Sequence, residues 1–104
     1  MGAESFTITQ EKTSNGVKFT VQGRVDTINA AELEYSLEQA AKGGHTNIVL
    51  NMLRVEYLSS TGIRVILKAY KEAKTAGKKF GIERPSECVK HVLGMVALEE
   101  MLVE

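Results

Sequence analysis

The chain has 104 residues, of which 13 are basic and 13 acidic, so its formal net charge is zero. That length fits a single domain over residues 1–104, because a second domain would have too small a core. Zero net charge gives no electrostatic reason to expect nucleic acid or an anionic membrane as the main partner. No apolar run reaches the roughly 18 residues that a membrane-spanning helix needs, so membrane insertion is not expected.

The first residues alternate between polar and apolar side chains, which predicts two half-buried strands. Ser5–Gln10 and Val17–Gln22 both show this period of two. Asn15 and Gly16 lie between them, and Asn-Gly readily adopts the positive backbone angles of a tight hairpin turn. We therefore expect an antiparallel hairpin at the start of the fold.

From Ile28 the apolar spacing changes to that of an amphipathic helix. Asn29 is the expected helix cap, with Glu32 three residues later as in a capping box. Ile28 is expected to pack on Leu33 as a hydrophobic staple. The pair Gly43-Gly44 supplies the left-handed geometry that ends such a helix.

A strand, a helix and another strand follow. The continuous apolar run Ile48–Leu50 predicts a central strand covered on both faces. A helical spacing of apolar residues begins at Ile63 and ends at Gly77, and Lys79–Ile82 predicts a further strand.

The last part of the chain predicts one more helix. Pro85 fits its first turn. The expected buried side of this helix consists of Val89, Val92 and Leu93. Leu98–Glu104 is expected to be a short strand or an extended tail.

Strands that alternate with helices imply right-handed parallel crossovers, which here add to the initial hairpin. The expected fold class is therefore α/β, with a mixed sheet begun by an antiparallel hairpin and with helices packed against it. Binding sites of such sheets lie beyond the carboxyl ends of the strands, where loops lead into helices. The two loops expected at that edge are Gly23–Asn29 and Glu56–Gly62.

The loop Leu58–Ile63 has three consecutive hydroxyl residues and then Gly62, before a helix whose far end is rich in lysine. The start of a helix has unpaired N–H groups and a partial positive charge, so it favours an anion. A phosphate on one of these hydroxyls would be tolerated there and would add about −1.5 to −2 charge, enough to break a docked partner. Serine and threonine are also common helix caps, so Ser59 or Thr61 can cap the helix while Ser60 stays exposed.

No other residues point to catalysis, a metal or a cofactor. His45 and His91 are isolated in sequence from one another and from Cys88, so ordinary surface or core roles are expected. The lone cysteine cannot build a disulfide framework, and a cytoplasmic location is expected. The sequence has no nucleophile elbow, Walker loop or dinucleotide fingerprint. A basic row at helical spacing is expected to be a solvated face, or alternatively a docking surface for an acidic partner: Arg64, Lys68, Lys71, Lys74, Lys78 and Lys79.

Several separated blocks of the sequence resemble the STAS domain of bacterial anti-sigma factor antagonists. The blocks are Gly23 to Asp26, Ala30 with Leu33, Ile48 to Asn51, Val55 to Ile63, and the later positions Gly77, Pro85, Val89 and Leu93. The resemblance thus covers nearly the whole chain. The spacing of the blocks makes it far more specific than the serine loop alone.

This resemblance implies a function without catalysis. Unphosphorylated members of the family bind an anti-sigma factor that is also a serine kinase, and the sigma factor is released. Phosphorylation of one serine at the start of the second helix weakens that complex, and a phosphatase of the PP2C type restores it. The family motif usually reads Asp-Ser-Ser/Thr-Gly, and its phosphate-accepting first serine matches Ser60, with Ser59 as the alternative acceptor. The expected partner-binding residues are Asp26, Ser59, Thr61, Gly62, Ile63 and Arg64.

Two positions depart from the family pattern. Ser59 stands where the family usually has aspartate, and Asn51 stands where it usually has aspartate at the end of the third strand. Loss of the carboxylate beside Ser60 leaves a second function open, that of an adaptor subunit of a lipid-transport ATPase or signalling complex without a phosphorylation cycle. A third is a small-ligand sensor that uses the same two loops. The sequence ends at Glu104, so the closing helix common in the family is expected to be missing or much reduced.

Overall fold

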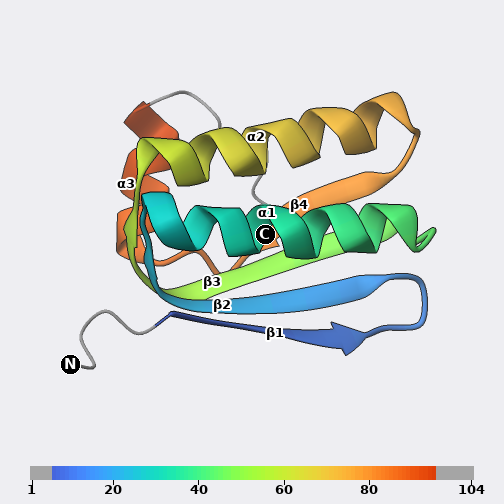
Figure 1. Ribbon diagram of the computed structural model, residues 1–104, viewed down its shortest axis with the longest axis horizontal. Coiled ribbons are helices and arrows are strands. Elements are labelled where there is room, and N and C mark those ends of the chain that lie inside the picture. Colours follow the sequence, from blue (N-terminus) through green and yellow to red (C-terminus); the bar gives the residue numbers. More distant parts are fainter. Residues whose placement is uncertain (1–5, 96–104) are drawn as a thin grey trace.

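The computed structural model describes residues 6–95, in which strands and helices follow one another along the chain (Figure 1). In chain order the elements are β1 (Phe6–Lys12), β2 (Val17–Val25), α1 (Thr27–Lys42), β3 (Asn47–Leu58), α2 (Ser60–Thr75), β4 (Lys79–Glu83) and α3 (Glu87–Met95). This order is the one predicted from the sequence. The predicted strand or tail at Leu98–Glu104 lies outside the described residues.

The strands form one mixed sheet in the order β1-β2-β3-β4. β1 and β2 pair antiparallel, from Phe6 opposite Gly23 to Lys12 opposite Val17. β2 pairs with β3, and β3 with β4, in parallel. The predicted α/β fold with a mixed sheet begun by a hairpin is therefore confirmed.

The hairpin turn has a different geometry from the one predicted. Neither Asn15 nor Gly16 has a positive φ, and residues 13–16 all lie between the two strands. Gly16 is needed for another reason, because a Cβ atom there would overlap the backbone carbonyl of Asn47 at the start of β3. Close packing of the turn against β3 thus explains this glycine.

The core lies between the sheet and two of the helices. α1 and α2 run side by side over one face of the sheet (Figure 1). On that face Phe19 pairs with Leu50, which pairs with Ile82, and all three side chains are fully buried. α3 packs against β3 and buries Val89 and Leu93.

The other face of the sheet is less covered. Val49 points to this face and is half-buried, whereas its neighbours Ile48 and Leu50 are buried. Within residues 6–95, the central apolar run is thus fully covered on one face only, not on both as predicted. Lys18 on β2 and Glu83 on β4 form an ion pair of 2.8 Å that spans β3.

β3 is much longer than the run Ile48–Leu50 from which it was predicted. Its buried residues alternate as far as Met52 and then recur at every third position, at Val55 and Leu58. Two register shifts against β2 place extra residues in β3. Such bulges break the period of two by which a strand is found in a sequence.

α1 begins earlier than predicted. Its N-cap is Asp26, whose Oδ1 accepts a hydrogen bond of 2.8 Å from the backbone N–H of Asn29. Asn29 therefore lies in the first turn, and the predicted capping box with Glu32 is wrong. The predicted staple is also wrong, since Ile28 is 81% exposed. Leu33 is five positions after Ile28, which places the two side chains on different sides of a helix with 3.6 residues per turn.

The helix ends agree with the glycines predicted to form them. Gly44 has a φ of 82° two positions after the end of α1, and Gly77 has a φ of 74° two positions after the end of α2. Pro85, however, lies before α3 rather than in its first turn. The Ser86 hydroxyl oxygen accepts from the backbone N–H of Val89 at 3.2 Å, which is the contact of a helix cap.

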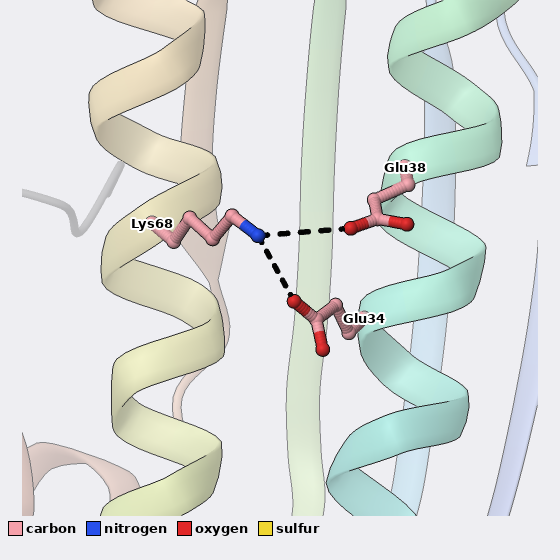
Figure 2. Close-up of polar contacts among 3 residues, drawn as sticks. All are labelled: Glu34, Glu38 and Lys68. Carbon is pink, nitrogen blue, oxygen red and sulfur yellow. Dashed lines mark hydrogen bonds and ion pairs between the residues drawn. The ribbon is translucent and has the colours of Figure 1, made fainter.

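An ion-pair cluster joins α1 to α2 (Figure 2). Nζ of Lys68 on α2 lies 3.1 Å from Oε2 of Glu34 and 3.7 Å from Oε2 of Glu38, both on α1. The hydrogen bond to Glu34, and then the negative charge of that carboxylate, raise the pKa of Lys68. These side chains are well exposed, so we expect the cluster to add only a little to stability.

Candidate functional site

The connections that lead into α1 and α2 meet at one end of the sheet (Figure 1). Each consists of a single residue, Asp26 before α1 and Ser59 before α2. The backbone N–H of Ser59 donates a hydrogen bond of 2.9 Å to the carbonyl of Val25. The predicted loops Gly23–Asn29 and Glu56–Gly62 thus contact each other, although most of their residues belong to strands or helices.

Ser59 is a buried helix cap. Its side-chain oxygen accepts from the backbone N–H of Gly62 at 3.1 Å, and its carbonyl accepts from Ile63 at 2.9 Å. The residue is 8% exposed. Its hydroxyl is therefore already used to satisfy the start of α2, as one of the sequence interpretations expected.

Ser60 has the opposite environment. It is the first residue of α2 and is exposed, whereas Thr61 beside it is half-buried. The first turn of α2 contains no acidic side chain. Free N–H groups and the helix dipole favour negative charge at this position. The two adjacent serines thus differ: the hydroxyl of Ser59 caps α2 and is buried, whereas Ser60 is exposed at a helix start that favours an anion.

Gly62 is required by close packing. A Cβ atom there would lie 2.8 Å from Cγ1 of Val25 and 2.9 Å from Cδ1 of Leu58. A glycine thus lets the first turn of α2 approach the ends of β2 and β3. Of the next two residues, Ile63 packs partly buried against the core and Arg64 is exposed.

Asp26 lies at the same end of the sheet, as predicted, but its carboxylate is engaged. Its Oδ1 caps α1 through the N–H of Asn29. The side-chain amide of Asn29 in turn donates a hydrogen bond of 2.8 Å to the carbonyl of Arg24. Asp26 therefore shapes the first connection and is half-buried rather than freely exposed.

Two features of this end of the molecule were missed in the sequence. Ile28 is a highly exposed apolar residue in the first turn of α1. The guanidinium carbon of Arg24 lies 4.4 Å from the ring centroid of Tyr57, which is 41% exposed. The offset of Ile28 from the core positions of the helix could have indicated its exposure. The Arg24–Tyr57 contact joins β2 to β3 and has no local sequence signal.

Among the residues that the structure describes, the remaining sequence candidates form no second site. No group of three or more His, Cys, Asp or Glu residues that could hold a metal occurs within residues 6–95. Cys88 is half-buried and His91 is exposed, both on α3. In the basic row, Lys68 pairs with α1 and Lys74 lies 5.4 Å from the ring centroid of Tyr70, so this row is partly engaged within the chain. No helix in the described part of the chain is long and apolar enough to cross a membrane.

Comparison with known sequences identifies relatives of this chain. A family model described as the STAS domain matches residues 7–103. BtrV of Bordetella bronchiseptica, named as an anti-sigma factor antagonist, is 33% identical over 67 residues. That alignment covers 64% of this chain and 58% of BtrV, less than two thirds of either. The anti-sigma-F factor antagonist RsfB of Mycobacterium tuberculosis is 26% identical over 97 residues, which cover 93% of this chain and 79% of RsfB.

Comparison with solved structures finds the same fold. The unphosphorylated form of the anti-sigma factor antagonist SpoIIAA gives a TM-score of 0.82 at 19% identity, and the match covers 93% of this chain and 86% of that one. A structure of phosphorylated SpoIIAA from Bacillus gives a TM-score of 0.76, also at 19% identity, with 95% and 89% covered. At this identity the match establishes the fold.

Proposed function

The chain belongs to the STAS domain family, and from this premise we propose that it acts as an anti-sigma factor antagonist. In its unphosphorylated form it binds an anti-sigma factor that is also a serine kinase, and the sigma factor is released. The names of BtrV, RsfB and SpoIIAA as anti-sigma factor antagonists support this proposal. Such a protein is not an enzyme, because it acts by offering a binding surface and withdrawing it.

The observation that carries the proposal is the exposed hydroxyl of Ser60 beside a serine that is already used as a cap. Ser60 is the proposed phosphate acceptor, since it is exposed at the start of α2 and the hydroxyl of Ser59 is buried. A phosphate there would add about −1.5 to −2 charge to a surface that docks without it. The helix start would tolerate that charge within the chain, while the bound partner would be displaced.

The proposed docking surface surrounds this serine. Thr61 and Arg64 lie in the first turns of α2, and Asp26 holds the neighbouring connection in place. Gly62 and Ile63 lie beneath this surface, where Gly62 packs against the ends of β2 and β3 and Ile63 packs against the core. A phosphatase of the PP2C type would remove the phosphate and restore binding, and the cycle would take place in the cytoplasm.

The proposal is tested by incubating the purified chain with candidate anti-sigma kinases from the same organism and ATP, followed by mass spectrometry of the peptides. We expect phosphate on the wild-type chain and on Ser59→Ala, and none on Ser60→Ala. Ser59→Ala is the matched control, because it removes the neighbouring hydroxyl by the same change. Phosphate retained on Ser60→Ala, or a wild-type chain that accepts none, contradicts the assignment of Ser60.

A second function remains as an alternative because Ser59 occupies the position where the family usually has aspartate. Without that carboxylate the chain could serve as an adaptor subunit of a lipid-transport ATPase or of a signalling complex, with no phosphorylation cycle. Co-purification distinguishes the two functions. A serine kinase recovered with the chain supports the antagonist, whereas a transport ATPase supports the adaptor.

A further inference from the structure

The outer face of α1 carries an exposed apolar stripe. Ile28 is 81% exposed, Tyr35 is 63% exposed, and Ala31 between them is also exposed. Their spacing of i, i+3 and i+7 places the three side chains on one face, over about 10 Å of helix. The same helix buries its opposite face through Ala30, Leu33, Leu37 and Ala40.

This stripe does not serve the core. Single exposed apolar residues are ordinary on protein surfaces, but three aligned along one helix are the pattern by which helices are recognised in apolar grooves. The remaining large exposed apolar residues in the described part of the chain lie on other elements, Leu53 and Tyr57 on β3 and Met95 on α3. α1 is therefore the described helix on which large exposed apolar side chains align.

The stripe starts at the end of the sheet that holds Ser60. Ile28 is the second residue of α1, two positions after the cap Asp26. The hydrogen bond from Ser59 to Val25 ties the beginning of α2 to the end of β2, directly before this cap. A protein seated over Ser60 consequently lies close to the first turn of α1, and its contact can continue along the stripe.

The charges beside the stripe indicate what the partner presents. Glu32 flanks it on one side and Glu38 on the other, at exposed positions of α1. Lys68 lies 3.7 Å from Glu38 and neutralises it only in part, while its shorter contact is with Glu34. An apolar stripe with acidic edges is complementary to an apolar surface with basic edges.

We infer that the stripe of Ile28, Ala31 and Tyr35 is a docking surface for the anti-sigma factor of the proposed function. That partner would cover the stripe with an apolar face edged by lysine or arginine. The inference rests on the proposed function and adds to it a contact on α1, outside the motif that contains the switch serine.

The test measures binding of the unphosphorylated chain to the purified anti-sigma factor by calorimetry. The variants are Ile28→Ser, Tyr35→Ser and the double variant, and Leu53→Ser is the matched control because it removes an exposed apolar side chain from β3. All three positions are exposed, so the folded state is retained. We expect each single change to weaken binding about tenfold and the double change about a hundredfold, with the control within about twofold of wild type.

Three other outcomes are informative. If the wild-type chain binds and the double variant binds within about twofold of it, the docking inference is wrong and the proposed function stands. If the wild-type chain binds no anti-sigma factor, both fail. If the chain alone sediments as a dimer and the double variant as a monomer, the stripe binds a second copy of the chain, which also overturns the inference.

Discussion

Ser59 and Ser60 show how two adjacent residues of the same type take different roles. Ser59 accepts a hydrogen bond from Gly62 inside the structure, and Ser60 faces solvent. We expect Ser59→Ala to lower the free energy of unfolding by about 0.5–2 kcal/mol, because it removes the cap of α2. Ser60→Ala should change it by less than about 0.5 kcal/mol. Urea denaturation checks this, and equal effects of the two changes would contradict the division of roles.

Gly62 allows the first turn of α2 to lie against the strand ends. Gly62→Ala places a Cβ atom within 2.9 Å of side-chain carbons of both Val25 and Leu58. We expect it to lower the free energy of unfolding by about 1–3 kcal/mol through overpacking. Gly43→Ala is the matched control, because Gly43 has a φ of −75° and a Cβ atom there meets its neighbours at 3.4 Å or more.

In thermal denaturation we expect the midpoint to fall for Gly62→Ala and to hold or rise for Gly43→Ala. A glycine replaced at a compatible backbone angle reduces the entropy of the unfolded chain, which favours the folded state. A Gly62→Ala midpoint equal to that of the control would show that Val25 and Leu58 move aside without cost.

At the scale of the elements, α1 and α2 pack side by side, and Lys68 links them through ion pairs with Glu34 and Glu38 (Figure 2). The folded state raises the pKa of Lys68 from its usual value of 10.5. The contribution of the Lys68 ion pairs to stability is therefore fully present below about pH 10.5 and is lost as the pH rises through the higher pKa of the folded state. We expect wild type to lose more stability than Lys68→Met when the pH rises from about 9 to above 10.5.

The midpoints of urea denaturation, measured at about pH 9 and above pH 10.5 for wild type and Lys68→Met, give the two losses of stability. Lys71→Met on the exposed side of the same helix is the control, since Lys71 is absent from the ion pairs of the described residues. The control should lose as much stability as wild type over this range. A Lys68→Met variant that loses as much stability as wild type would show that the ion pairs of Lys68 do not contribute to stability.

The elements were predictable to the extent that their patterns are local. Apolar spacing and glycines identified the order of strands and helices and the ends of α1 and α2. The second half of β3 was not found, because bulges against β2 change the spacing of its buried residues at Val55 and Leu58. The cap of α1 was misplaced because Asp26 and Asn29 are both good capping residues, and the sequence alone does not choose between them.

In the candidate site, too, the features with a local sequence signal were predictable and the long-range contacts were not. A cap among the hydroxyl residues before α2 was predicted from a local signal, with Ser60 exposed as one arrangement, and Ser60 was singled out through the family resemblance. The bond from Ser59 to Val25 and the stacking of Arg24 on Tyr57 join residues far apart in sequence. Such contacts depend on the register between β2 and β3 and thus need the assembled sheet.

At the scale of the whole molecule, the 13 basic residues balance the 13 acidic residues, so the formal net charge is zero. The end of the sheet brings together two helix starts and one exposed serine, within a chain of 104 residues. On a neutral chain, a phosphate of about −1.5 to −2 charge is a large local change. The size and charge of the domain thus suit a switch operated by a single modification.

The most direct test compares the affinity of one anti-sigma factor for two forms of the chain. Calorimetry is performed with the unphosphorylated protein and with protein phosphorylated on Ser60, and Ser60→Ala serves as the control without charge. We predict that the unphosphorylated chain and Ser60→Ala bind alike, and that the phosphorylated chain binds at least about tenfold more weakly. Equal affinity of the phosphorylated and unphosphorylated forms would contradict the switch.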